Sequence, residues 1–443
     1  MRIQLSDHFT YKRLLRFVAP SIIMMICTSV YSIIDGLFVS NFVGKTQFAA
    51  VNLIFPVLMA MSTVGFMLGT GGSAIVSMAL GMEQREKANR DFSLLIYTGI
   101  VLGMFFAITG FIFMPTIASA LGATGELLHY TIIYGRILSV GQAAFILQNM
   151  FQSFFPVAEK PELSLKVSVS AGLTNFFLDF LFIVVFQWGL AGAAAATVMG
   201  QIVGGIVPLI YFIRKNNSLL QLTGTKFDGR VLLKACTNGS SEMLTNLSTS
   251  IVNMLYNYQL MKIAGENGLA AYGVIMYIYF IFAAIFIGYS IGGSPIISYH
   301  YGAGNYDELK NLFKKSLIII GIAGITLTVL AELLALPLTK IYVSYDAELL
   351  EMTCRGFRLY SLAFLVGGFN SFSSSFFTAL GDGGVSAAIS FLRTLVFQVS
   401  VILILPVFLG LDGIWLAIGA ADLLALGVTV TFFLVKRRKY HYA

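Results

Sequence analysis

The chain has 443 residues, of which 57% are hydrophobic and only 11% are charged, and its mean hydropathy is +0.84. Soluble domains carry roughly 25% charged residues, so this composition excludes an ordinary water-soluble protein and indicates a chain embedded in lipid. The net charge of +7 does not require a nucleic-acid partner, because basic loops beside an anionic membrane surface explain the excess.

Long apolar segments recur along the whole sequence. A helix needs roughly 20 apolar residues to cross a bilayer core of about 30 Å, and the alternating ten-residue pattern of outer-membrane β-barrels is absent. The sequence therefore predicts an all-α polytopic membrane protein. Its twelve transmembrane helices are expected at residues 17–39, 51–80, 92–114, 131–155, 165–187, 190–213, 240–262, 269–300, 315–337, 354–379, 384–408 and 413–435.

Lys and Arg are distributed unevenly between the two sets of connecting segments. With the N-terminus placed inside, 22 of the 28 fall on the inner side, Arg393 among them, and six fall on the outer side. Cytoplasmic loops carry the excess of Lys and Arg. We therefore expect both termini to be cytoplasmic, in the inner (cytoplasmic) membrane of a bacterium or archaeon, with no signal peptide removed from the polar segment before the first span.

One sequence pattern occurs twice, displaced by 221 positions. The stretch GTGGSAIVSMALG (69–81) parallels SIGGSPIISYHYG (290–302), and WGLAG (188–192) parallels LGLDG (409–413). Each copy holds six predicted spans, an even number, so both copies enter the membrane from the same side. Parallel repeats of this kind form transporters with a cleft between two bundles.

The repeats define the predicted domain organisation. We expect an N-terminal six-helix bundle at residues 1–213, a cytoplasmic linker at 214–239 and a C-terminal six-helix bundle at 240–443. This plan resembles the multidrug and toxin extrusion (MATE) family over about residues 14–435. The resemblance is carried by DGLFVSNFVGKTQFAAVNLIFPV (35–57), by GGSAIVSMALGMEQREKAN (71–89), and by NFFLD followed by GLAGAAAATVMGQ. It implies cation-coupled efflux through a V-shaped cleft, by a protein that works as a monomer.

Two acidic residues lie inside predicted spans of the first half, Asp35 in the first span and Asp179 in the fifth. Asp179 stands in LTNFFLDFLFI (173–183), with no Lys or Arg nearby in the sequence. An ionisable group at the centre of a span costs roughly 2.5 to 3.5 kcal/mol on insertion scales, and such groups by default mark transport pathways. We therefore expect both carboxylates to take part in function.

Three further polar residues add oxygen ligands to this pair. Asn175 lies one helical turn before Asp179, on the same face, and Thr197 lies among small residues that allow close helix packing. The fourth span contributes Asn149. Carboxylate, amide and hydroxyl oxygens suit Na⁺, but the same carboxylates also suit protons.

The family resemblance points to the same residues. It assigns Asp35, Asn175, Asp179 and Thr197 to a cation site of the first lobe, with Asn149 in a supporting position. Hydrogen bonding that only holds neighbouring helices together is the structural alternative for each of them. In the second half, the position equivalent to Asp179 by the repeat offset is Ser400, so we expect the coupling site in the first lobe alone.

The lining of the expected cleft is predicted from aromatic, Met and polar residues. Aromatic faces suit flat organic cations, and flexible Met side chains suit varied substrates. The candidates are Tyr31, Glu242, Met254, Tyr256, Tyr277, Tyr279 and Asn370. Pro20 is a candidate hinge of the first span, although a proline at a helix start would explain it as well. Asp422, in the last span, is left without an assignment.

Secondary antiport is the function that these observations favour. The substrates would be amphipathic, often cationic drugs or metabolites, exported by alternating access in exchange for Na⁺ or H⁺, with no cofactor. The chain has no GxxxxGK[ST] motif to drive transport with ATP, and its scattered histidines indicate no enzyme. The alternative is a lipid-linked saccharide flippase of the same architecture. Such a flippase is expected to line its cleft with several Arg or Lys residues that hold pyrophosphate, whereas the basic residues here lie almost entirely in inner loops.

Overall fold

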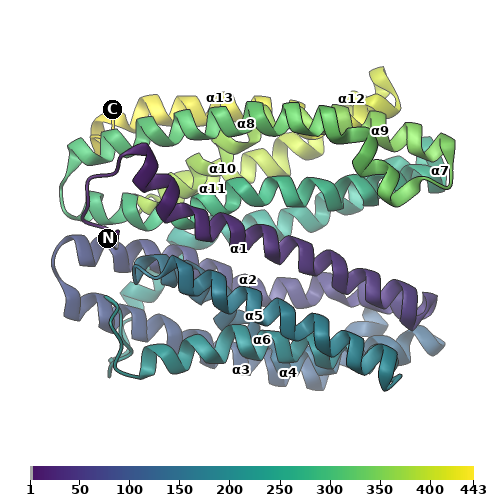
Figure 1. Ribbon diagram of the computed structural model, residues 1–443, viewed down its shortest axis with the longest axis horizontal. Coiled ribbons are helices and arrows are strands. Elements are labelled where there is room, and N and C mark those ends of the chain that lie inside the picture. Colours follow the sequence, from purple (N-terminus) through teal and green to yellow (C-terminus); the bar gives the residue numbers. More distant parts are fainter. Residues whose placement is uncertain (1–2) are drawn as a thin grey trace.

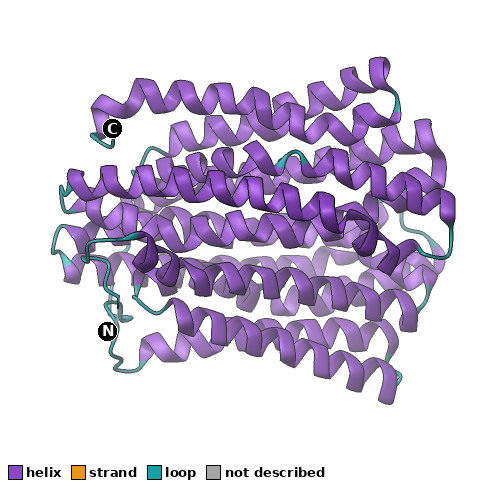
Figure 2. Ribbon diagram, turned by 45° about the horizontal axis from the view of Figure 1, so that its top comes forward, coloured by secondary structure: helices purple, strands orange, loops and turns teal. Residues whose placement is uncertain are grey.

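The computed structural model describes residues 3–443, and this part of the chain is built from helices and short connections without any strand (Figure 2). Because lipid offers no hydrogen-bond partners to the backbone, a helix, which satisfies its own peptide groups, is the natural element for these apolar segments. The predicted all-α membrane fold is confirmed.

The N-terminal bundle consists of the first six α-helices and two short π-helical segments. Their bounds are α1 (Tyr11–Phe38), η1 (Val39–Val43), α2 (Lys45–Gly81), α3 (Arg85–Ala120), α4 (Gly125–Val157), α5 (Pro161–Asp179), η2 (Phe180–Val185) and α6 (Gly189–Ile213). Pro20 lies inside α1, nine residues after its first residue, so the alternative of a proline at the helix start is wrong.

The C-terminal bundle follows after a connection at residues 214–228. It consists of α7 (Gly229–Gly302), α8 (Tyr306–Val343), α9 (Ala347–Ser361), α10 (Phe364–Ala379), α11 (Gly383–Phe391), η3 (Leu392–Phe397), α12 (Gln398–Leu409) and α13 (Leu411–Tyr440). Ten helices of the described chain are long and apolar enough to cross a membrane. The longest, α7, has 74 residues and is broken at Gly265, which has a φ of +62°, so it provides two crossings. The short helices α9 and α10 follow each other, at the place of the tenth predicted span.

The two bundles lie side by side, with α2–α6 in the lower half and α8–α13 in the upper half of Figure 1, while α1 runs obliquely between them. Both chain termini lie at the same end of the molecule, on the left of that view, which we call the terminal end. At this end α2 packs against α7 with backbone touching backbone. A Cβ atom added to Gly71 would lie 2.5 Å from the nitrogen of Gly239.

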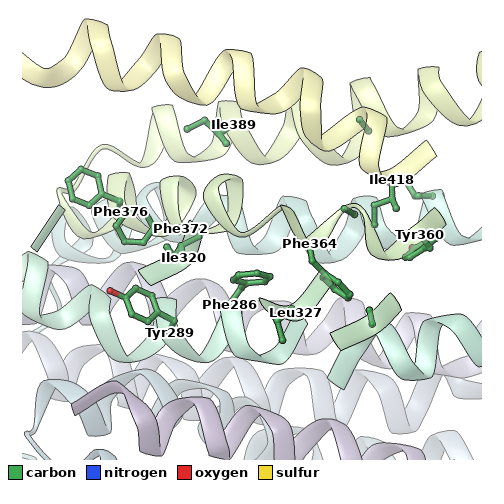
Figure 3. Packing of buried hydrophobic residues seen from close by; sticks show 14 of the residues in the cluster. Phe286, Tyr289, Ile320, Leu327, Tyr360, Phe364, Phe372, Phe376, Ile389 and Ile418 are labelled. Carbon is green, nitrogen blue, oxygen red and sulfur yellow. The ribbon is translucent and has the colours of Figure 1, made fainter. Parts of the chain in front are cut away.

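Each bundle has its own apolar core. In the N-terminal bundle a buried aromatic group joins α3, α4 and α6, with Phe92 against Phe154 and Phe212 at ring-centroid distances of 4.9 and 5.1 Å. The C-terminal core, shown in Figure 3, includes Phe286 and Phe364. Leu5 and Phe9, which precede α1, are fully buried in this second core.

Candidate cation site

A cavity of about 150 Å³ lies inside the N-terminal bundle, between α1, α2, α4, α5 and α6. We call it the N-bundle cavity. Since a water molecule in liquid occupies roughly 30 Å³, it has room for a small cation and a few waters. Its polar lining consists of Tyr31, Ser32, Asp35, Tyr134, Gln142, Asn175, Thr197 and Gln201.

Both acidic residues of the site stand where an α-helix changes into a π-helical segment. Asp35 lies four residues before η1, and Asp179 is the last residue of α5, directly before η2. A π-helical turn inserts one extra residue into a helix, releases backbone groups from the regular ladder, and is frequent at functional sites. Asp35 lines the N-bundle cavity, and Asp179 is buried beside it without being part of the lining.

The structure brings four of the five predicted coupling residues together. The carboxyl group of Asp35 interacts with the side chains of Asp179, Asn175 and Thr197. Asp179 is fully buried, and so is nearly all of Asn175. The Thr197 hydroxyl donates to the carbonyl oxygen of Ala193 on its own helix at 3.0 Å, which leaves its lone pairs available to a cation.

The carboxylates of this site have no basic partner, and most of their oxygen atoms accept no hydrogen bond from the described residues. Both oxygens of Asp179 and one of Asp35 accept no hydrogen bond from any described residue, and the Asn175 amide nitrogen and the Gln201 amide oxygen are also unpartnered. Among the described residues, no Lys, Arg or His lines the cavity. Since an unpaired buried carboxylate is strongly disfavoured, these two acids require a proton or a metal cation from solution. The oxygen atoms available fit Na⁺ as well as H⁺.

Asn149, the fifth predicted coupling residue, lies outside the cavity lining. It is buried on α4, one helical turn beyond Phe145, and its amide nitrogen has no partner among the described residues. Four polar residues of the lining were not predicted from the sequence: Ser32, Tyr134, Gln142 and Gln201. The only signal for the two glutamines is an amide within an apolar span, which is common in membrane helices.

The residues predicted to line a cleft are dispersed. Tyr31 lines the N-bundle cavity. Tyr256 is fully buried in the C-terminal core, where it stacks on Tyr272 at 4.9 Å. Tyr279 is half-buried and stacks on Phe364 at 5.2 Å.

The remaining predicted cleft residues also differ in burial. Met254 is 65% exposed, and Tyr277 is exposed to a smaller extent. Glu242 is half-buried on α7, and its side chain has no hydrogen-bond or ion-pair partner in the described chain. Asn370 is fully buried inside the C-terminal bundle.

Arg393 corrects the count of loop charges. It was counted with the inner loops, but it lies in η3, inside a membrane-spanning segment, and its guanidinium group pairs with the carboxylate of Asp422 on α13. Asn370 donates to the main-chain oxygen of Asp422 at 2.8 Å. The C-terminal bundle therefore contains a charged network of its own, which the repeat pattern did not indicate.

Comparisons with known proteins agree with this fold. The MatE family model matches residues 20–181 and again residues 243–404. The multidrug export protein MepA of Staphylococcus saprophyticus is 23% identical over 97% of this chain and 94% of its own length. The MepA protein of Staphylococcus haemolyticus is 27% identical over 71% of this chain and 69% of its own length.

Solved structures show the same architecture. A crystal structure of MATE in complex with MaL6 superimposes with a TM-score of 0.91 at 23% identity, covering 98% of this chain and 97% of that one. An outward-facing multidrug resistance MATE family transporter of the MOP superfamily gives a TM-score of 0.91 at 24% identity, covering 98% and 96%. The family model covers well over half of the sequence, and the fold agrees throughout. The chain is an integral membrane transporter, not an enzyme, and it belongs to the MatE family.

Proposed function

We propose that this transporter is a secondary antiporter, which exports amphipathic, often cationic drugs or metabolites in exchange for Na⁺ or H⁺ by alternating access. The proposal is carried by one observation: the half-buried Asp35 and the fully buried Asp179 lie together, and no basic residue is among the described residues that line the cavity beside them. Such a pair is stable only while it holds a positive ion, so loading and unloading change the free energy of the surrounding helices.

The position of Asp35 supports a coupling of the ion to the movement of the bundles. Asp35 stands on α1, and the same helix touches the other bundle at its opposite end. A Cβ atom on Gly292 of α7 would lie 3.1 Å from the Cα of Val18, and one on Gly288 would lie 2.5 Å from the Cα of Ile22. Pro20 lies between these two contacts, where it removes one backbone hydrogen bond and makes a bend less costly. We propose that α1 bends at Pro20 when the ion binds or leaves.

Alternating access then involves two rigid bundles. We propose that residues 1–213 and 240–443 move as two lobes about the predicted linker at 214–239, in which residues 214–228 form the connection and residues 229–239 the start of α7, with both termini in the cytoplasm. Removing Arg393 from the loop count leaves a strong excess of Lys and Arg at the terminal end. Since the bundles are in contact at that end, we propose that the cleft between them opens toward the outside in this conformation.

The proposed substrates are small organic compounds, because the related MepA proteins are named multidrug export proteins. A cleft lined by Glu242, Met254, Tyr277 and Tyr279 would attract cations and fit flat rings. The flippase alternative is weaker, since Arg393, which would have to hold a pyrophosphate, is already neutralised by Asp422. We further propose that the protein works as a monomer in the lipids of the inner membrane.

The test is dye efflux in proteoliposomes with an imposed Na⁺ or pH gradient, applied separately. Asp179→Asn and Asp35→Asn are each expected to reduce gradient-driven efflux by roughly tenfold or more, because a neutral amide does not exchange the ion. Glu332→Gln is the matched control, since this acid of α8 is partly exposed and lies 3.7 Å from Arg358. Wild-type efflux with unchanged ion dependence in both Asp variants would refute the coupling role. Translocation of lipid-linked oligosaccharide without dye efflux would favour the flippase.

A further inference from the structure

Arg393 and Asp422 form a charge pair inside the membrane-spanning part of the C-terminal bundle. The guanidinium Nε donates to Oδ1 of Asp422, and Nη2 donates to Oδ2 at 3.2 Å, so the carboxylate is held by both arms of the guanidinium fork. The side chain of Asp422 is 2% exposed and that of Arg393 is 22% exposed. Ionisable groups at this depth are costly and by default functional.

The polar groups that contact the pair are engaged as well. The Arg393 Nη1 donates to the Ser371 hydroxyl at 2.9 Å. Asn370 donates to the main-chain oxygen of Asp422, and its own amide oxygen accepts from Thr429 at 2.9 Å. This satisfied network differs from the N-bundle cavity, where both oxygens of Asp179 lack partners. The C-terminal carboxylate therefore needs no ion from solution.

The pair lies at the place in the second repeat that corresponds to the N-bundle cavity in the first. The residue 221 positions before Asp422 is Gln201, which lines that cavity. Arg393 continues α11, which begins 222 positions after α5, the helix that carries Asp179. The residue 222 positions before Arg393 is Ala171, and the residue 221 positions before it is Gly172. Gly172 packs against Tyr31, which lines the cavity.

The two repeats thus neutralise buried acid in two ways. In the N-terminal bundle the corresponding position is a small residue, and the positive charge must come from solution. In the C-terminal bundle the charge is attached to the chain, and an arginine guanidinium stays protonated under physiological conditions. A Cβ atom on Gly367 would lie 2.7 Å from Oδ2 of Asp422 and 3.4 Å from Nη2 of Arg393, so α10 packs directly against the pair on this side.

We infer that Arg393 is a tethered cation, which permanently occupies the cation site of the second repeat and so restricts ion exchange to the first. The hydrogen bonds between Arg393 and Asp422 support the occupancy of the C-terminal site. Its consequence for coupling rests on the proposed ion exchange at Asp35 and Asp179. Removal of the side chain of Arg393 should therefore create a second site, open to a free cation of matching shape.

The test is chemical rescue of Arg393→Ala with guanidinium chloride at low millimolar concentration, read as the melting temperature of the purified protein in detergent. Asp422 is left buried without its cationic partner, with only the Asn370 amide at 3.4 Å, so the variant is expected to melt several degrees below the wild type and to recover most of this loss with guanidinium. The rescue must disappear when Asp422→Asn is added, because the anion that binds the free guanidinium is then gone. No recovery, or equal recovery in the double variant, would overturn the inference.

Two controls keep the test decisive. Arg355 and Asp412 form a forked pair of the same kind, with 2.5 Å between Nη2 and Oδ2, but their side chains are 68% and 33% exposed. Arg355→Ala should therefore melt close to the wild type and show no rescue. If Arg393→Ala does not fold, the uncharged pair Arg393→Gln with Asp422→Asn must still fold and must transport with the ion dependence of the wild type. A changed ion dependence in that pair would contradict a fixed occupant.

A transport measurement separates this inference from the proposed function. Efflux by Arg393→Ala in proteoliposomes should fall by roughly tenfold and return with guanidinium. Asp179→Asn should stay inactive with or without guanidinium. Rescue of Arg393→Ala together with normal efflux by Asp179→Asn would retain the tethered cation and refute only the coupling site of the first bundle.

Discussion

Gly81 and Gly302 lie at equivalent positions of the two repeats, and the backbone of α7 packs directly against Gly81 just as the backbone of α2 packs directly against Gly302. A Cβ atom on Gly81 of α2 would lie 2.1 Å from the carbonyl oxygen of Tyr299, and one on Gly302 of α7 would lie 2.3 Å from that of Met78. Met78 and Tyr299 are themselves equivalent by the same repeat offset. The bundles therefore meet at the terminal end across an approximate two-fold axis, with no side chain between the backbones.

Substitution at this contact should open the terminal end. Gly81→Val or Gly302→Val places carbon atoms where the opposite backbone lies, and such overpacking typically costs about 1 to 3 kcal/mol. This cost falls on the conformation closed at the terminal end, so each variant should shift the population toward the other conformation and slow efflux by roughly five- to a hundredfold. The measurement is dye efflux, together with thiol labelling of a cysteine introduced near the contact.

The control for this prediction is a glycine on the same helix with free space around it. A Cβ atom on Gly273 of α7 would meet nothing within 4 Å, so Gly273→Val should keep efflux close to the wild type. Equal efflux by Gly81→Val, Gly302→Val and the wild type would show that the contact does not have to close tightly during transport.

The sequence was sufficient to predict the architecture. The length of each apolar span follows from the thickness of the bilayer, and the internal repeat can be found by comparing the two halves of the sequence. The same repeat places Gly81 and Gly302 in register, but no pattern states that the two copies touch each other. The acids of the site stand out because Asp35 and Asp179 interrupt apolar runs. Gln201 does not, because an amide within a span is ordinary.

Arg393 shows why charge counting has a limit. The positive-inside rule treats each Lys and Arg as a loop charge, and it gives no means to identify a basic residue that is neutralised within the bundle. Its partner Asp422 lies 29 residues away, on a helix separated from η3 by α12. A contact of this kind depends on the packing of three helices and becomes visible only in three dimensions.

The segment before α1 should hold the two bundles together at the terminal end. Glu308 at the start of α8 lies 2.5 Å from Nδ1 of His8 and accepts from the Phe9 nitrogen at 2.9 Å. On the other side, the Leu5 nitrogen donates to Glu159 of the N-terminal bundle at 2.8 Å. The segment thus contacts both bundles within five residues.

Removal of its buried aromatic anchor tests this role. Phe9 is fully buried against Phe17, at a ring-centroid distance of 6.1 Å, so Phe9→Ala is expected to destabilise the protein by about 3 to 5 kcal/mol. Phe227→Ala is the control, since that side chain is almost fully exposed and its loss should change stability by less than about 0.5 kcal/mol. Denaturant unfolding in detergent checks both values. Similar losses in the two variants would contradict an anchoring role.

Asp382 should give the protein an acid-sensitive contribution to stability. It lies in the connection before α11, caps that helix, accepts from the Tyr440 hydroxyl at 2.7 Å and lies 3.2 Å from the Lys436 ammonium group. Burial acts to raise its pKa, but the Tyr440 and Lys436 contacts outweigh it and hold the pKa of Asp382 below the usual value.

The sign of the effect follows from this depressed pKa. The stabilisation is complete above the pKa of an unfolded aspartate, about 3.9, and it is lost as the pH falls through the lower value of the folded state. Asn caps a helix as well as Asp but carries no charge for Lys436, so Asp382→Asn should be less stable by roughly 1 kcal/mol at neutral pH, and the difference from the wild type should shrink as the pH falls below 4. Melting temperatures recorded between neutral pH and pH 3 test this, and a difference that stays constant or grows toward low pH would rule out the assignment.

Gln201 should tune the affinity of the N-bundle cavity for its ion. It lines the cavity with Asp35 and Asn175, and its amide oxygen has no partner among the described residues. Gly141 on α4 makes room for this oxygen, since a Cβ atom there would lie 2.6 Å from it. Gln201→Leu keeps the volume of the side chain but removes the oxygen, so we expect the apparent affinity for the coupling ion to fall by roughly tenfold.

The measurement of this affinity uses the stabilisation that a bound ion gives to the folded protein, which grows with the ratio of ion concentration to dissociation constant. Melting temperatures are recorded against Na⁺ concentration at fixed pH and against pH without Na⁺. Gln201→Leu should reach the same maximal stabilisation as the wild type, but at about ten times the ion concentration. Met199→Leu, at an exposed position of the same helix, controls for the loss of packing. An unchanged curve for Gln201→Leu would mean that the Gln201 oxygen does not contribute to ion binding and that the affinity depends on the two carboxylates.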